Sequence, residues 1–208
     1  MPLFYQQDIN ETTRLGVWKI EEDESFFLRT VPLQHSITHP NKRLQHLAGR
    51  YLLPYLFPGF PTTAIEIADT RKPFLSGEQY HFSISHCGRY AAALVSSTER
   101  VGIDIEMITP RVEKIKHKFL HPDELAFVHS QDIPQQTELL TLLWSAKEAM
   151  FKWWGSGEVD FSEVLRTKNF TFSEEGIIPA FFIKEQTMIA LDIHYQMREG
   201  VSLAWVIK

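Results

Sequence analysis

The sequence predicts an α+β protein built from two halves. Two long segments, 41–57 and 135–154, carry apolar residues at helical spacing, whereas several shorter segments alternate apolar and polar residues as strands do. A polar turn at 97–100 separates one such mixture from the next, and 208 residues are enough for one large domain or two small ones. We therefore expect an N-terminal half, 1–98, and a C-terminal half, 99–208.

The N-terminal half combines one long helix with several strands. Segment 14–20 has strand character, and 21–28 begins a short acidic helix. The helix at 41–57 is expected to start at an Asn41 cap and to kink or end at Pro54. One stripe of this helix is basic and consists of Arg43, His46 and Arg50. Further strands are expected at 64–67, 80–86 and 90–96, the last two as a hairpin around Cys87-Gly88-Arg89.

The C-terminal half begins with a strand at 101–106 and continues with three helices. Segment 111–120 has helical spacing, and Pro122 starts a new helix because proline and acids are favoured in a first turn. The long helix 135–154 should end before Gly155, since glycine adopts the left-handed conformation that closes many helices. Four more strands are expected at 169–173, 179–184, 187–196 and 201–207.

The composition limits the possible function and location. The net charge of −5 argues against a general nucleic-acid binder, which would be basic overall. A single cysteine, Cys87, excludes an intrachain disulfide and fits a reducing compartment. The N-terminus lacks the basic and apolar regions of a signal peptide, and no apolar run reaches the roughly 18 residues of a membrane span. We expect a soluble cytoplasmic protein.

Acidic side chains recur in a pattern that suits a metal site. On the predicted strand, Asp104 and Glu106 share one face. A stripe of the long helix, separate from its core-facing residues, consists of Trp144, Glu148 and Lys152. If the stripe meets the strand face, Asp104, Glu106 and Glu148 form an all-oxygen site of the kind that Mg²⁺ prefers. The alternative is ordinary exposed carboxylates, with Glu148 and Lys152 as an ion pair that supports the helix.

Four blocks of sequence resemble the motifs of the 4′-phosphopantetheinyl transferases. Gly102-Ile103-Asp104-Ile105-Glu106 and Trp144-Ser145-Ala146-Lys147-Glu148-Ala149-Met150-Phe151-Lys152 are similar to the paired signature of that family. Arg71-Lys72-Pro73-Phe74 and Phe82-Ser83-Ile84-Ser85-His86-Cys87-Gly88 resemble two motifs of its larger, surfactin-synthetase-activating type. The blocks agree in order and spacing over roughly residues 40 to 160.

The resemblance implies a fold, a reaction and a ligand. The fold is a pseudo-two-fold pair of similar α+β subdomains within a monomer. The enzyme moves the 4′-phosphopantetheine group of coenzyme A to a serine of an apo-carrier protein and releases 3′,5′-ADP. The metal is Mg²⁺, and Mn²⁺ is possible because the ligand types do not distinguish the two ions.

The resemblance also implies roles for individual residues. The metal ligands correspond to Asp104, Glu106 and Glu148. Glu124 matches the proposed general base, and Lys152 matches the lysine that contacts the reacting phosphate. The expected coenzyme A contacts are Lys42, Arg43, Arg50, Lys72, Ser85 and His86. For each of these, a plain structural role remains open, such as a helix N-terminal carboxylate for Glu124.

Carrier proteins of this family are acidic helical bundles, so a basic surface would complement them. The basic row Arg111, Lys114 and Lys118 lies beside an apolar seam of Val112, Ile115 and Phe119 in the predicted helix, and it is our candidate docking surface. Ordinary solvation of a helix face is the alternative. Two other functions remain open, namely a metal-dependent nucleotide pyrophosphate hydrolase and an inactive relative that only binds carrier proteins.

Overall fold

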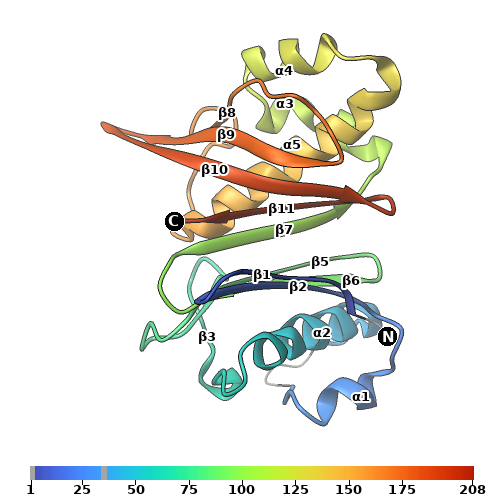
Figure 1. Cartoon of the computed structure of the whole chain (residues 1–208), viewed down its shortest axis with the longest axis vertical. Helices are drawn as coiled ribbons and strands as arrows, with labels where there is room; N and C mark the ends of the chain where they lie inside the picture. Colours follow the sequence, from blue (N-terminus) through green and yellow to red (C-terminus); the bar gives the residue numbers. More distant parts are fainter. Residues whose placement is uncertain (1–2, 34–36) are drawn as a thin grey trace. The chain divides into compact units, whose positions relative to one another are not determined.

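The computed structural model describes residues 3–33 and 37–208 (Figure 1). The chain divides into two compact units, unit 1 (Met1–Val101) and unit 2 (Gly102–Lys208). The sequence analysis expected the division at 98/99, just before this point. Each unit combines helices with β-sheet, so the α+β class is confirmed, while the pseudo-two-fold relation stays a prediction.

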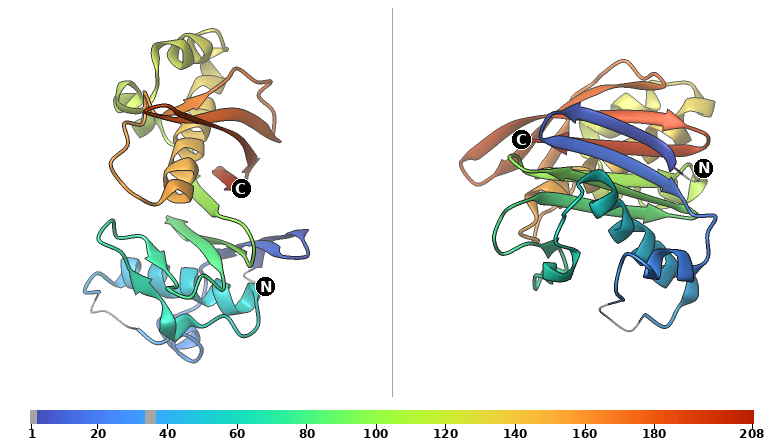
Figure 2. Two further views of the ribbon diagram at one scale, coloured as in Figure 1. Left: turned by 90° about the vertical axis from the view of Figure 1, so that its left-hand side faces the viewer. Right: turned by 60° about the horizontal axis from the view of Figure 1, so that its bottom comes forward.

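Unit 1 contains a four-stranded antiparallel sheet in the order β1-β2-β6-β5. Its strands are β1 (Leu3–Asn10), β2 (Thr13–Lys19), β5 (His81–Cys87) and β6 (Tyr90–Ser96). Helix α2 (Pro40–Leu56) covers one face of the sheet (Figure 2, right). The core between them includes Trp18, Leu47, Leu52, Leu53 and Phe82. The hairpin predicted around Gly88 is confirmed, whereas β1 was not predicted.

The smaller elements of unit 1 connect this sheet and helix. They are α1 (Glu24–Leu28), the 3₁₀ helix η1 (Thr62–Ala64), and the paired short strands β3 (Glu66–Ile67) and β4 (Pro73–Phe74). The cap of α2 is His39 rather than Asn41, because Pro40 occupies the first turn, where its missing N–H costs no hydrogen bond. The helix also continues past Pro54 to Leu56.

Unit 2 contains a five-stranded sheet in the order β7-β11-β10-β9-β8. The strands are β7 (Val101–Met107), β8 (Leu165–Thr167), β9 (Glu175–Lys184), β10 (Thr187–Arg198) and β11 (Val201–Ile207). Helix α5 (Ile133–Trp154) crosses one face of the sheet (Figure 2, left). As predicted, it ends at Gly155, whose φ of 73° is left-handed. Its residues at helical spacing on one side are all buried, namely Leu139, Leu143, Ala146, Met150 and Trp153.

The remaining helices of unit 2 gather at one end of α5 (Figure 1). They are the 3₁₀ helix η2 (Pro110–Lys114), α3 (Lys116–Phe119) and α4 (Pro122–His129). The single helix predicted at 111–120 is wrong, because the backbone leaves helical geometry at Ile115, where ψ is 0°. The strand predicted at 169–173 is also wrong, since the chain pairs with β9 earlier, through β8. No helix of the described residues is long and apolar enough to cross a membrane.

Candidate active site

The site begins with a close approach between β7 and α5. A Cβ atom added at Gly102 would overlap the carbonyl oxygen of Ala149 and lie 2.6 Å from the backbone nitrogen of Trp153. Only glycine therefore allows the strand backbone to lie this close to the helix backbone. Because alternate residues of a strand share a face, Asp104 and Glu106 follow Gly102 along the same side, toward α5.

The acidic face of β7 meets the polar stripe of α5, which is the condition that the sequence analysis set for a metal site. The Asp104 carboxylate is 3% exposed, and its Oδ1 accepts a hydrogen bond from Lys152 Nζ at 2.7 Å. Glu106 Oε1 accepts a 3.3 Å hydrogen bond from the indole Nε1 of Trp144. Glu148 interacts electrostatically with Asp104, Lys152 and Glu106. Residues nearly 50 positions apart therefore form one charged cluster, which we call the acid cluster: Asp104, Glu106, Glu148 and Lys152.

Burial makes negative charge costly in the acid cluster. It raises the pKa of Glu148 to about 7, and the charges of Asp104 and Glu106 act in the same direction, while Lys152 opposes them. Burial and the charge of Asp104 also raise the pKa of Glu106. One ammonium group accompanies three carboxylates here, so a bound cation would favour their charged forms.

The acid cluster fits a hard divalent cation in its chemistry. Its oxygen ligands come from two facing elements, and Mg²⁺ binds carboxylate oxygens together with water and substrate phosphate. Within the described residues, no three His, Cys, Asp or Glu side chains are already arranged around a metal position. The carboxylates would thus have to turn toward an ion, and Asp104 would have to share its oxygens with Lys152.

Glu124 lies in a different setting from the acid cluster. It is 3% exposed, and its Oε2 accepts hydrogen bonds from Lys147 Nζ at 2.6 Å and from the His121 backbone N–H at 2.8 Å. Its Oε1 accepts hydrogen bonds from the backbone N–H and the hydroxyl of Thr167, both at 2.7 Å. The general-base role implied by the resemblance stays a prediction.

The partner of Glu124 was missed by sequence reasoning. Lys147 is fully buried, and burial lowers its pKa to about 8 although the Glu124 carboxylate opposes this change. At about 100° per residue, helical spacing only turns Lys147 away from Glu148. The available signal was its position among the core-facing residues of α5, where a lysine must be paired.

In unit 1, the expected phosphate-binding residues differ in how accessible they are. Arg43 pairs with Glu24 at 2.7 Å, and Arg50 is 6% exposed and contacts the His46 ring at 3.1 Å. Burial, and secondarily the charge of Arg100, lowers the pKa of Lys72 to about 8. Of the others, Ser85 is buried, whereas Lys42 and His86 are exposed.

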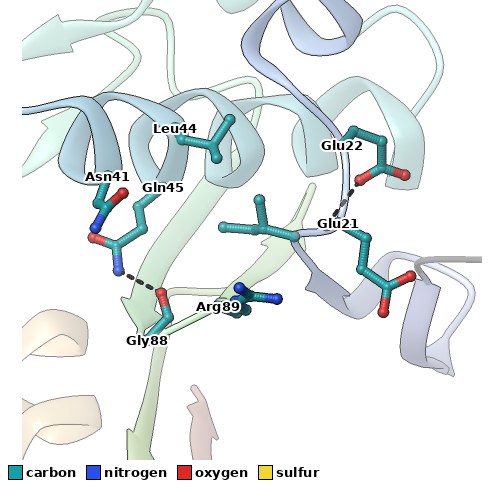
Figure 3. A pocket seen from close by; sticks show the side chains of 8 residues that line it. Glu21, Glu22, Asn41, Leu44, Gln45, Gly88 and Arg89 are labelled. Carbon is teal, nitrogen blue, oxygen red and sulfur yellow. Dashed lines mark hydrogen bonds between the residues drawn. The ribbon is translucent and has the colours of Figure 1, made fainter.

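A pocket of about 330 Å³ lies in unit 1 (Figure 3). Its walls come from the segment that follows β2, the start of α2 and the β5–β6 turn. Gln45 bridges the last two by donating to the Gly88 carbonyl at 2.9 Å. The lining residues are Ile20, Glu21, Glu22, Asn41, Leu44, Gln45, Gly88 and Arg89. The pocket thus adjoins both the start of the basic helix and the turn that follows His86.

The basic row is on the surface, but the apolar seam expected beside it is not. Arg111, Lys114 and Lys118 are exposed on η2 and α3. Val112 and Phe119 are 5% and 1% exposed and belong to the core of unit 2, while Ile115 is half-buried. Both side chains pack in this core, so the basic row has no apolar seam of these residues beside it on the surface.

Comparisons with known proteins establish the family. A sequence model of the 4′-phosphopantetheinyl transferase superfamily matches residues 100–206, just over half of the chain. The chain belongs to this superfamily. The match begins at β7 and contains the acid cluster, Glu124 and Lys147.

Individual relatives of this superfamily give the same result. A 4′-phosphopantetheinyl transferase of Bacillus subtilis is 37% identical over 87 residues, which is 41% of this chain and 38% of the relative. The 4′-phosphopantetheinyl transferase Sfp of Bacillus subtilis (strain 168) is 36% identical over 77 residues, 37% of this chain and 34% of Sfp. Both agree with the surfactin-synthetase-activating type that the motifs indicated.

A longer match is with the enterobactin synthase component D of Escherichia coli (strain K12), which is 34% identical over 143 residues. This match covers 64% of the present chain and 63% of that relative. The chain thus spans less than two thirds of the length of each of these relatives.

We expect Gly102→Ala to push β7 and α5 apart and so to separate the residues of the acid cluster. The added methyl group meets the backbone of α5, so the free energy of unfolding should fall by about 1–3 kcal/mol. Chemical denaturation measures this change. Gly77→Ala is the matched control, because its Cβ would approach no atom closer than 3.8 Å, and it should alter stability by less than about 0.5 kcal/mol. Equal stability of the two variants would contradict the close approach.

Glu148→Gln should change how the stability of the protein depends on pH. Because the pKa of Glu148 rises from 4.5 to about 7 on folding, the folded state binds more protons in this interval. Wild-type stability should therefore fall as the pH rises from about 4.5 to 7 and then level off.

In buffer with EDTA, Glu148→Gln should be more stable than wild type at pH 8 by about 1 kcal/mol, a value discounted for solvent screening. At pH 4.5 this difference should vanish. Thermal unfolding at both pH values measures it, and Glu138→Gln, an exposed site on the same helix, is the control. A pH-independent difference would refute the raised pKa.

Proposed function

We propose that this protein transfers the 4′-phosphopantetheine group of coenzyme A to a serine of an apo-carrier protein, releasing 3′,5′-ADP. The observation that carries the proposal is the meeting of Asp104 and Glu106 of β7 with Lys152 and Glu148 of α5. These four residues belong to two motifs that the family shares, and they lie within the region matched by the family model.

Each group of the acid cluster has a task in this reaction. Asp104, Glu106 and Glu148 would hold Mg²⁺, or Mn²⁺. When bound, the ion screens the charge of the diphosphate and of the leaving group. Lys152 is 25% exposed and pairs with Asp104, so its ammonium group can turn to a phosphate oxygen near the metal. The serine proton must pass to a base, and the resemblance gives this role to Glu124.

Recognition of coenzyme A would use unit 1. The exposed Lys42 and His86 would contact phosphate oxygens, and Arg43, Arg50, Lys72 and Ser85 complete the residues implied by the resemblance. The neighbouring pocket is large enough for part of a nucleotide and offers the guanidinium of Arg89 (Figure 3). Glu21 and Glu22 line the same pocket. Because like charges repel, we expect a phosphate group to bind at the Arg89 side and not beside these two carboxylates.

A mass assay tests the proposal. The protein is incubated with coenzyme A, Mg²⁺ and an apo-carrier protein, and the carrier is weighed by mass spectrometry. A gain of one phosphopantetheine group is expected. Asp104→Asn should lower the rate on the order of 10²-fold or more, because charge stabilisation in the transition state is lost, whereas Glu138→Gln should not change it.

The other outcomes of the assay separate the remaining functions. Breakdown of coenzyme A without a mass gain would indicate a pyrophosphate hydrolase, and neither event would indicate a protein that only binds carriers. An Asp104→Asn variant as active as wild type would refute the role of the acid cluster.

We further propose that the carrier protein docks on the exposed basic row Arg111, Lys114 and Lys118. Acidic helices of a carrier would find complementary charge there, and such complementarity accelerates association. Since Val112 and Phe119 are buried, charge rather than an apolar seam is expected to supply the attraction. As part of this proposal we keep the expectation of a monomeric, cytoplasmic protein.

Charge reversal tests this surface. The double variant Lys114→Glu, Lys118→Glu should raise the KM for the carrier about 10-fold and leave the KM for coenzyme A unchanged, because only the carrier contacts this row. The control Lys168→Glu, Lys184→Glu makes the same change in net charge elsewhere in unit 2. Equal effects of the two double variants on the carrier KM would contradict docking at the basic row.

A further inference from the structure

The carboxylate of Glu124 has no hydrogen-bonding capacity left. A carboxylate offers about four acceptor positions, two on each oxygen. Oε2 uses its positions for Lys147 and the His121 N–H, and Oε1 uses its positions for the Thr167 N–H and hydroxyl. All four distances lie between 2.6 and 2.8 Å. A proton acceptor needs a lone pair directed at the substrate hydroxyl, or at one bridging water.

The ammonium group of Lys147 also has no hydrogen-bonding capacity left. Its three N–H bonds point to Glu124 Oε2 at 2.6 Å, to the Phe119 carbonyl at 2.6 Å and to the Phe161 carbonyl at 2.9 Å. Lys147 is fully buried and Glu124 is 3% exposed. The Glu124–Lys147 pair is therefore a desolvated ion pair in which both partners are satisfied, the condition under which a buried pair is tolerated.

The pair joins several segments of unit 2 at one point. Phe119 ends α3, His121 caps α4, Phe161 lies in the segment before β8, and Thr167 ends β8. Lys147 is the contribution of α5. Successive residues of a helix are rotated by about 100°, so fixing Lys147 on one side fixes the direction of Glu148 and Lys152 on another.

We propose that Glu124 is a positioning residue that acts through Lys147 to hold the acid-cluster residues of α5 against β7, and that it is not the base. This inference rests on the proposed transfer reaction. If Glu124 released its partners to take a proton, the Lys147 ammonium would stay buried without its counter-charge, the strongly destabilising way to break such a pair. The serine proton would then pass to another acceptor near the reacting phosphate.

A double-mutant cycle separates positioning from proton transfer. The variants are Glu124→Gln, Lys147→Met and the two combined, and Glu163→Gln serves as an exposed control. Glu124→Gln alone should lower the transfer rate about 10- to 100-fold and raise the Mg²⁺ concentration for half-maximal rate, as losing a supporting contact does. In the Lys147→Met background it should change the rate by less than about 3-fold, because the partner through which it acts is gone.

The result that would overturn the proposal is a rate loss on the order of 10²- to 10⁴-fold from Glu124→Gln in both backgrounds, as expected when a general base is removed. The Tm values of all variants are measured first, and rates are compared well below the lowest of them. Glu124→Gln should lower Tm in the wild-type background but not in Lys147→Met, where it removes an uncompensated buried charge.

Amide hydrogen exchange in the wild-type protein tests the same idea if a variant fails to fold. The backbone N–H groups of His121 and Thr167 donate to Glu124, so their protection reports whether its carboxylate stays in place. Protection should stay within about 3-fold when coenzyme A, Mg²⁺ and a carrier lacking its serine hydroxyl are added. A fall of about 10-fold or more would overturn the proposal.

Failure of the proposed function gives a different result. A wild-type protein without transfer activity would refute the transferase assignment, whereas the exchange experiment would still decide whether ligands release Glu124.

Discussion

The candidate site depends on the direct contact between the backbones of β7 and α5 at Gly102. The overlap that a Cβ would make with Ala149 and Trp153 leaves no room for any other residue type without displacing the helix. Because a strand alternates its faces, this contact also determines what comes next along β7. Asp104 reaches Lys152, and Glu106 reaches Trp144. Because Gly102 has no side chain, the two acidic residues that follow it on the same face lie next to the helix.

The charges gathered by this contact are unbalanced. Lys152 pairs with Asp104, but burial still raises the pKa values of Glu106 and Glu148. A cluster that only stabilised the fold would be expected to pair its carboxylates, since buried charges are favourable only with hydrogen-bonded partners. The proposed Mg²⁺ ion would neutralise this excess of negative charge.

Local sequence patterns predicted the elements that carry the site, but not the contacts that join distant segments. Alternation in β7 and the separate stripes of α5 are local signals, and they showed which residues share a face. The contact between Asp104 and Lys152 is known only from the structure. The edge strand β1 was missed because its residues do not alternate clearly, and its burial pattern is irregular. The helix at 111–120 looked continuous because spacing does not register a backbone break such as that at Ile115.

Two glutamates and two lysines of one small unit show how environment decides the role of a side chain. Glu124 and Lys147 are paired in the protein interior, and backbone groups and Thr167 take their remaining hydrogen-bonding positions. Glu148 and Lys152 are partly exposed, and Lys152 has a partner that a metal ion would compete for. The motif places Lys147 next to Glu148 in sequence, yet the helix directs them to opposite tasks. Two adjacent residues of one helix can therefore differ in their task. In our proposal Lys147 helps to hold the helix in place, and Glu148 belongs to the site where the reaction occurs.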